Sequence, residues 1–257
     1  MPDRGLRVLW QANAPWVTSG YGVQSNSLIP RLLSMPEVED VGIFAYYGVQ
    51  GTKTRQRVGV GGGITPLRWV DCYPIRSDPW GNDVIHDHAA DFGADIVISL
   101  LDIWVLADDY GARGYRWVAY FPVDTQPVAP AVLRKISKAY LPVVYSRFAA
   151  AECAKVGLEV ECVPHGVETR LYKPYRPADR RAARDVIAMP RDAFVVGTVA
   201  ANKGHPPRKG FSQLFAAFRT FSDRHPDARL YVHSLVTEEQ GGPTLAALAE
   251  APGVRGR

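Results

Sequence analysis

Short apolar runs, rich in valine and isoleucine, recur along the chain and alternate with segments whose apolar positions follow helical spacing. Runs of this length predict strands buried in a sheet, and the helices between them predict parallel strands with helices on both faces. We expect strands at residues 6–12, 41–47, 95–100, 116–121, 140–145 and 160–163, and one or two short strands within the irregular residues 48–82. The pattern predicts an α/β fold with a Rossmann-like N-terminal domain.

The segments between these strands predict helices, the first of them directly after the first strand. Pro30 should kink this helix or shift its start to a later residue, because proline lacks the amide hydrogen that a helix interior needs. Further helices are expected at residues 83–92 and 146–155. His86 and His88 stand two positions apart and point to different faces of a helix, so this pair does not predict a metal site.

The composition changes near residue 174, where the Arg-rich stretch RPADRRAARD follows. We expect an N-terminal domain at residues 1–174, a linker at 175–191 and a second domain at 192–257. The second domain should contain strands at residues 194–201 and 229–234 and helices at residues 211–225 and 244–250. Two strands and two helices are fewer than a doubly wound domain normally needs, so we expect this domain to be partial and the chain to be a fragment.

A polar loop with three basic residues separates the first strand and the first helix of the second domain: Asn202, Lys203, Arg208 and Lys209. The preceding residues, 195–201, are β-branched and nearly uncharged, which predicts a strand buried on both faces. Helix N-termini at the carboxyl ends of parallel strands bind anions. Lys203 and Lys209 can bracket one anionic group, which favours a phosphate site over the alternative of a solvated basic turn.

Polar residues also follow the strands of the N-terminal domain. Asp102, Asp124 and His165 each come directly after an expected strand. Open α/β sheets bind their ligands at the carboxyl ends of the strands, so these side chains are candidates for a ligand site. The alternative for the two carboxylates is a helix cap or an ordinary turn.

The loop after the first strand ends in the sequence SGYG, in which Gly20 and Gly22 flank Tyr21. Two glycines at the start of a helix let the backbone approach a ligand closely. Turns use glycine in any case, so a lone GxG leaves both interpretations open.

Charge, cysteine content and hydropathy narrow the class of protein. The 257 residues carry a formal charge of +4 without a continuous basic stripe, which does not indicate a nucleic-acid partner. The three cysteines lack CxxC spacing, so neither a disulfide framework nor a zinc site is expected, and we infer a reducing cytoplasm. The N-terminus has no signal-peptide pattern, and no apolar run reaches about 18 residues. We therefore expect a cytoplasmic protein without a transmembrane segment, with peripheral membrane contact left open.

Two stretches resemble a known family. PHGVETRLYKP resembles the junction of retaining glycosyltransferases of the GT-B fold, in the glycogen-synthase-like group called family four. VVGTVAANKGHPPRKGFSQLFAAF resembles the start of their second domain, where a basic loop ends in RKG. The resemblance covers the chain from Leu6 to about Ser234. It implies two Rossmann-like domains that face a cleft, the first binding the acceptor and the second the nucleotide-sugar donor.

The resemblance also implies roles for individual residues. Lys209 matches the lysine that holds the donor diphosphate, and Lys203 or Asn202 takes the place of the arginine that usually accompanies it. The glycines of SGYG match a loop that reaches toward the diphosphate. Asp124 falls near the position where many relatives carry a histidine beside the reacting sugar. We therefore take Asp124 and Asp102 as catalytic candidates, and Tyr21 and His165 as residues of the cleft and junction.

The implied reaction moves a sugar to a carbohydrate or other hydroxyl acceptor with retention at the anomeric carbon. Negative charge builds on the leaving diphosphate, which Lys203, Arg208 and Lys209 are suited to stabilise. The resemblance implies that the leaving phosphate itself takes the acceptor proton, without a cofactor or a required metal. One feature of the family, a C-terminal ExxxxxxxE element that contacts the donor, has no counterpart before Arg257.

Other functions fit the sequence less completely. A nicotinamide-dependent dehydrogenase needs GxGxxG after the first strand, and SGYGVQS lacks the third glycine. A retaining hydrolase needs two carboxylates about 5 Å apart, a pair that Asp102 and Asp124 would form only if they meet in space. A non-catalytic sugar- or nucleotide-binding module, or an inactive fragment, is the stronger alternative.

Overall fold

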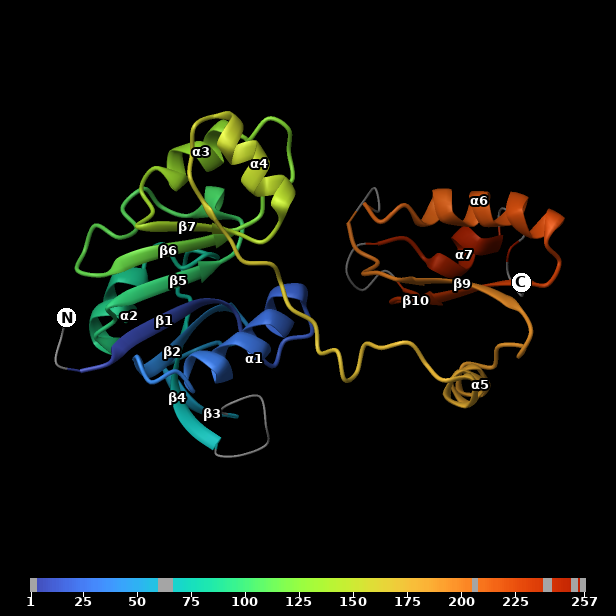
Figure 1. Cartoon of the computed structure of the whole chain (residues 1–257), viewed down its shortest axis with the longest axis horizontal. Coiled ribbons are helices and arrows are strands. Elements are labelled where there is room, and N and C mark those ends of the chain that lie inside the picture. Colours follow the sequence, from blue (N-terminus) through green and yellow to red (C-terminus); the bar gives the residue numbers. More distant parts are fainter. Residues whose placement is uncertain (1–3, 60–66, 205–207, 238–241, 251–253, 255–257) are drawn as a thin grey trace. The chain divides into compact units, whose positions relative to one another are not determined.

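The computed structural model describes residues 4–59, 67–204, 208–237, 242–250 and 254. The chain divides into two compact units, Met1–Val167 and Glu168–Arg257, which we call unit 1 and unit 2 (Figure 1). Each unit is described by itself.

Unit 1 contains an eight-stranded sheet with the strand order β3-β4-β2-β1-β5-β6-β7-β8. All its pairs are parallel except β3 with β4, which confirms the predicted mainly parallel sheet. The strands are β1 (Leu6–Asn13), β2 (Val38–Tyr47), β3 (Thr54–Gly59), β4 (Leu67–Pro74), β5 (Ile96–Leu100), β6 (Arg116–Phe121), β7 (Leu141–Val144) and β8 (Glu161–Cys162).

Helices cover both faces of this sheet, as the alternating pattern predicts (Figure 1). One hydrophobic core joins one face to side chains such as Ile29 of α1, and a second core joins the other face to Ile85 of α2, Val132 of α3 and Ala149 of α4. The helical elements are α1 (Gly20–Leu32), α2 (Ile85–Phe92), the 3-10 turn η1 (Ile103–Val105), α3 (Pro130–Ile136) and α4 (Arg147–Lys155).

The first helix begins earlier than Pro30 suggested. Ser19 caps α1 by accepting a hydrogen bond from the amide of Gly22 at 3.0 Å, so the helix starts at Gly20 and the expectation of a later start is wrong. Pro30 lies within the last turn, where the missing amide affects a single intrahelical hydrogen bond. The sequence also did not predict α3, which begins with Pro130 at its first position.

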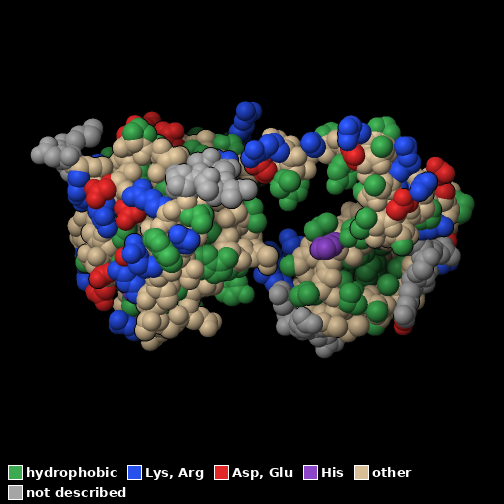
Figure 2. Space-filling view, turned by 90° about the horizontal axis from the view of Figure 1, so that it is seen from below, with side chains coloured by type: hydrophobic (Ala, Val, Ile, Leu, Met, Phe, Trp, Pro, Cys, Tyr) green, Lys and Arg blue, Asp and Glu red, His purple; other side chains and the backbone are tan. Residues whose placement is uncertain are grey.

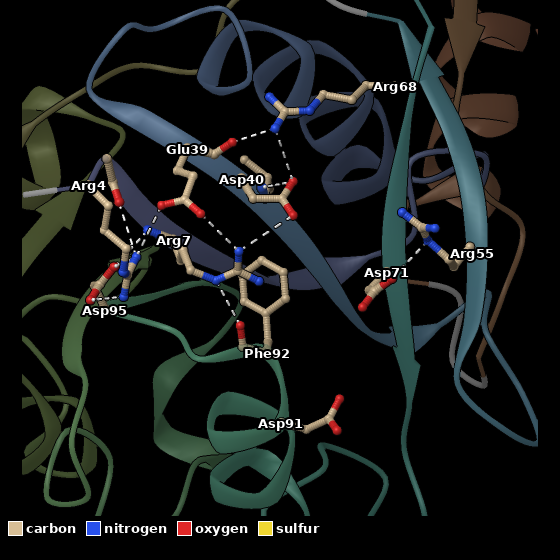
Figure 3. A network of polar contacts seen from close by, with 12 residues as sticks. Arg4, Arg7, Glu39, Asp40, Arg55, Arg68, Asp71, Asp91, Phe92 and Asp95 are labelled. Carbon is tan, nitrogen blue, oxygen red and sulfur yellow. Dashed lines mark hydrogen bonds and ion pairs between the residues drawn. The ribbon is translucent and has the colours of Figure 1, made fainter.

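A polar network ties strands and helix together at the amino edge of this sheet (Figure 3). Arg4 forms a bidentate pair with Asp95, with N–O distances of 2.9 and 3.0 Å. Arg7 donates to the carbonyl of Phe92 at 2.9 Å and lies 3.4 Å from Glu39. These contacts join β1, β2, the end of α2 and the start of β5 at the amino edge of the sheet. The carboxyl edge lies opposite.

Unit 2 has a two-stranded parallel sheet, β9 with β10. Three phenylalanines of α6 lie in its buried core, and Val196 of β9 and Leu230 of β10 pack against this core. The elements are α5 (Pro177–Val186), β9 (Phe194–Val199), α6 (Phe211–Arg224), β10 (Ala228–His233) and α7 (Leu245–Glu250).

The prediction that residues 195–201 are buried on both faces is wrong. Val199 is 78% exposed, and Phe194 at the other end of β9 is 57% exposed. The helices cover one face of the small sheet, so Val196 is covered while Val199, which alternates with it, faces outward. Hydrophobic side chains of unit 2 that reach the surface are visible in Figure 2.

The residues expected to form a linker contain α5. Pro177 stands at its first turn and Asp179 in the same turn suits the helix dipole. The buried guanidinium of Arg184 donates to the carbonyls of Pro190, Arg191 and Ala193, each at 2.8 Å. This one side chain fastens α5 to the start of β9.

Candidate functional site

The carboxyl edge of the sheet in unit 1 brings together the polar residues that follow its strands. β1, β5, β6 and β7 are consecutive in the sheet, so the residues after them lie along one edge. Asn13 ends β1, Asp102 follows β5, and Asp124 follows β6. Because neighbouring parallel strands end at the same edge, side chains separated by more than 100 residues share a surface.

Asp102 and Asp124 line one cavity of about 240 Å³. Asp124 is exposed, and Asp102 is partly buried. The sequence left open whether the two carboxylates meet, and they do line a common space. Trp104, which is 58% exposed, lines the same cavity and was not predicted as a site residue. Its position two residues after Asp102, at the same strand end, is the signal that points to it.

A cluster of aromatic rings lies at the same edge of the sheet. The hydroxyl groups of Tyr21 and Tyr145 are 3.2 Å apart, and His165 stacks on Tyr145 with ring centroids 4.1 Å apart. His165 also meets Tyr120 edge to face at 5.4 Å and Tyr21 at 6.5 Å. The structure therefore brings the two predicted residues, Tyr21 and His165, together. Tyr145 and Tyr120, which complete the cluster, lie inside apolar strand-like runs and gave no sequence signal.

Burial sets the protonation of this cluster. It raises the pKa of Tyr21 and lowers the pKa of His165, so both groups are neutral near pH 7. The Nε2 atom of His165 is buried and has no hydrogen-bond partner among the described residues. A neutral imidazole in this position can donate or accept one hydrogen bond.

The two glycines of SGYG have different surroundings. A Cβ atom at Gly22 would lie 2.1 Å from the carbonyl oxygen of Val17, so the packing of the loop requires glycine there. A Cβ atom at Gly20 would meet no atom of the described residues within 4 Å, so only this position is open to a ligand. Asn13 donates to the Ser19 hydroxyl at 2.6 Å and so fixes the cap from which α1 begins.

In unit 2, the basic residues of the loop lie on the surface. Lys203, Arg208 and Lys209 are all exposed, and they lead into the N-terminus of α6, while residues 205–207 lie outside the described part of the chain. Gly210 before this helix has φ of 65°, a conformation that favours glycine. In the described structure no side chain caps α6, and its first turn contains no acidic residue.

Asn202 has a different position from the basic residues beside it. Its side chain is fully buried, and its amide nitrogen lies 3.1, 3.4 and 2.8 Å from the carbonyl oxygens of Leu235, Thr237 and Pro243. Gly242 packs so closely that a Cβ atom there would lie 2.4 Å from the Asn202 side-chain oxygen. Asn202 therefore holds the loop after β10 against the basic loop inside unit 2, which is a structural role.

The described residues contain no group of three or more His, Cys, Asp or Glu side chains that could hold a metal ion. Within the same residues, every helix is too short or too polar to cross a bilayer.

Comparison with known proteins relies on structure, since no family model matches the chain and no curated protein matches its sequence. The sucrose-phosphate synthase of Thermosynechococcus elongatus matches with a TM-score of 0.65 and 12% identity, over 97% of this chain and 68% of that one. The E. coli trehalose-6-phosphate structure bound with UDP-2-fluoro glucose matches at 0.59 and 12%, over 96% and 69%.

A third solved structure, the UDP-GlcNAc 2-epimerase of Neisseria meningitidis bound to UDP-GlcNAc, matches with a TM-score of 0.57 and 8% identity. The match covers 96% of this chain and 68% of that one. At such identities the likeness concerns the fold. The chain has an α/β fold of the GT-B type, with a Rossmann-like first unit and the strands and helices of a second Rossmann-like unit.

Proposed function

We propose that this protein is a glycosyltransferase that moves a sugar from a nucleotide-diphosphate sugar to an acceptor hydroxyl. The observation that carries the proposal is a loop with three exposed cations, Lys203, Arg208 and Lys209, that leads into the N-terminus of α6, where no side chain of the described structure forms a cap. The amides of a first helical turn have no intrahelical acceptors, and the helix dipole favours an anion there. Lysine and arginine beside such amides suit a diphosphate.

Two further findings support a nucleotide-sugar donor. Two solved structures that share the fold are bound to a UDP sugar. The sequence resemblance to the glycogen-synthase-like group points to the same class of donor. A nucleotide-sugar-binding protein without turnover is the alternative, and it predicts the same anion site.

The reaction we propose proceeds with retention and uses no cofactor. The bond between the anomeric carbon and the diphosphate oxygen breaks, and the acceptor oxygen bonds to the same face of that carbon. The acceptor proton passes to the leaving phosphate, whose charge Lys203, Arg208 and Lys209 stabilise. Asp102 and Asp124, at the carboxyl edge of unit 1, are assigned to the acceptor side.

Calorimetry with UDP and GDP tests the anion site. Lys209→Ala removes a charge-assisted hydrogen bond worth roughly 1.5–3 kcal/mol, so affinity should fall by about ten- to a hundredfold. Arg208→Ala should cost less if its side chain points to solvent. Lys173→Ala, an exposed lysine elsewhere in unit 2, is the matched control and should bind like the parent. Equal binding by parent and Lys209→Ala would reject the anion site.

Turnover separates the enzyme from the binding module. Release of UDP or GDP from a panel of nucleotide sugars, dependent on added acceptor, is the signature of a transferase. Tight nucleotide-sugar binding without any acceptor-dependent release would favour the module.

A further inference from the structure

A second cavity of unit 1 lies at the amino edge of the sheet, opposite the edge that carries Asp102 and Asp124. Its volume of about 680 Å³ is within the range of about 300–1,000 Å³ that small-molecule sites occupy. The strands β1, β5 and β6, which are neighbours in the sheet, begin at this cavity. The loop before β6 forms the remaining wall.

The strand side of the cavity is mainly apolar. Leu6 and Ile96 contribute aliphatic side chains from the first positions of β1 and β5. Tyr115 contributes its ring, since its hydroxyl group lies 3.3 Å from Nδ1 of His86 in α2. Such a wall suits the flat, apolar body of a ligand.

The loop side is kept free of side chains by two glycines. Gly111 and Gly114 have φ angles of 79° and 83°, a conformation that favours glycine. A Cβ atom at Gly114 would meet no atom of the described residues within 4 Å, so this position borders open space. A flat molecule can therefore approach the backbone closely on this side.

One of the two charged residues of the lining, Asp95, is already neutralised. Arg4 donates to its two carboxylate oxygens at 2.9 and 3.0 Å (Figure 3). The backbone amide of Arg7 donates to the same carboxylate at 2.8 Å. With three donors in place, this carboxylate has little attraction left for a cationic ligand.

The other charged residue, Arg116, has no carboxylate partner in the described part of the chain. Its guanidinium lies over the ring of Tyr140, 4.7 Å from the centroid, and donates to the Tyr140 hydroxyl at 3.4 Å. A guanidinium has five N–H donors, so most of them remain for a ligand.

The backbone of the strand starts offers no comparable donors. The amides of Leu6, Asp95 and Arg116 already donate to backbone carbonyls at 2.7 to 2.9 Å. The Arg116 side chain is therefore the group of the described lining that can bind an anion. A phosphate group carries about −1.5 to −2 charges at pH 7, whereas a carboxylate carries one, which a single arginine balances.

We propose that this cavity binds a small carboxylic acid with a flat, apolar body. Its carboxylate accepts two parallel hydrogen bonds from the fork of Arg116, and its body packs against Leu6, Ile96 and the ring of Tyr115. The site lies at the other edge of the sheet from the candidate functional site. It is therefore independent of the proposed transfer reaction, and both sites can be occupied at once.

The test uses the full chain and three probes: 2-naphthoate, its uncharged analogue 2-naphthamide, and acetate. NMR titration of the ¹⁵N-labelled chain should show 2-naphthoate binding roughly two- to fivefold more tightly than 2-naphthamide, the difference that an exposed ion pair makes. Acetate, which lacks the apolar body, should not bind at the same concentrations. The amide signals of Gly111 and Gly114 should shift with 2-naphthoate, and that of Gly20, at the carboxyl edge, should not.

Variants test the assignment of the carboxylate to Arg116. Arg116→Gln should remove the preference for 2-naphthoate and leave the affinity for 2-naphthamide unchanged. Arg113→Gln, which removes the same charge from the same loop outside the lining, is the matched control and should keep the preference. Both arginines are exposed, so neither change should affect folding.

Three outcomes would overturn the inference. The parent may bind no 2-naphthoate, bind it no more tightly than 2-naphthamide, or lose it to competition with UDP, which would place the probe at the donor site. An unchanged preference in Arg116→Gln would likewise reject the role of this residue. A parent that binds 2-naphthoate here but neither UDP nor GDP would keep this site and lose the proposed function.

Discussion

At the scale of single residues, the Asn202 side chain joins parts of unit 2 that are far apart in the chain. The three carbonyl groups around its amide lie 33 to 41 positions later in the chain. An amide nitrogen has two hydrogens, so the three carbonyls share them. The contacts bind the loop after β10 to the residue directly before Lys203.

We therefore expect Asn202→Ala to destabilise unit 2 by about 2 kcal/mol, because three partly buried carbonyls lose their donor. Nucleotide binding should weaken as well, since Lys203 loses its support. Urea unfolding and calorimetry with UDP measure the two effects. Asn26→Ala, an exposed asparagine of α1, is the matched control and should change stability by less than about 0.5 kcal/mol. An Asn202→Ala protein as stable as the control would contradict this role.

His165 gives unit 1 a dependence on pH. Its folded-state pKa is lowered by burial, so near and below its ordinary value of about 6.5 the unfolded chain binds more protons than the folded one. The stability that a neutral His165 provides is present above that pH and is lost as the pH falls through it. His165→Phe keeps a ring on Tyr145 but removes the titration.

The parent should therefore lose more stability than His165→Phe between about pH 7 and about pH 5. Urea unfolding at both pH values measures this difference. His88, whose pKa burial also lowers, is present in both proteins and leaves the comparison unaffected. Parallel pH profiles for parent and variant would show that His165 does not contribute.

At the scale of elements, the N-terminus of α6 has no side-chain cap in the described structure, as is also the case for α2, α3 and α5. Ser19 caps α1 and Ser146 caps α4, each by accepting a backbone hydrogen bond at 3.0 Å, whereas no described side chain caps α6. Ser212→Asp would place a carboxylate in its first turn. That charge should stabilise the helix by about 0.3–1 kcal/mol through the dipole.

The same carboxylate should weaken UDP binding, because it competes with the diphosphate for the amides and the cations. Stability and affinity then move in opposite directions, which a general folding defect cannot produce. Thermal unfolding and calorimetry on one sample provide both values. Ser212→Asn, uncharged and of similar size, is the control. Unchanged UDP affinity in Ser212→Asp would argue against a phosphate at this helix.

Some elements could be predicted from the sequence and others could not. The apolar runs predicted β1, β5 and β6 nearly to the residue, because a strand in a parallel sheet is apolar along its whole length. The helices α3 and α5 were missed, since each begins at a proline within a stretch that otherwise suggests a loop or linker. The exposure of β9 was missed because burial depends on what covers the second face of the sheet, which β9 itself does not encode.

The candidate site likewise has features that the sequence predicted and features that it did not. The cations before α6 and the carboxylates after β5 and β6 were predictable because their chemistry is local to a strand end. The burial of Asn202 and the ring stack of Tyr145 on His165 arise from contacts across at least 20 positions, and single-sequence patterns do not contain them.

At the scale of the molecule, the two units differ in how well their sheets are enclosed. β5 lies between β1 and β6, with cores on both faces of the sheet, whereas β9 pairs only with β10 in the described structure and is covered on one face. Amides of β9 should therefore exchange with solvent at a much lower opening free energy than those of β5. Native-state hydrogen exchange measures both. Equal protection of the two strands would contradict this difference.

The open face of the β9–β10 sheet has a consequence for work at high protein concentration. Val199, Val195 and their neighbours present apolar surface next to strand edges whose amides and carbonyls have no partner strand in the described structure. Such surfaces pair readily with a second copy. We expect light scattering by the chain to rise with concentration and to fall when Val199 is replaced by lysine, which makes that variant the better starting material for crystallisation.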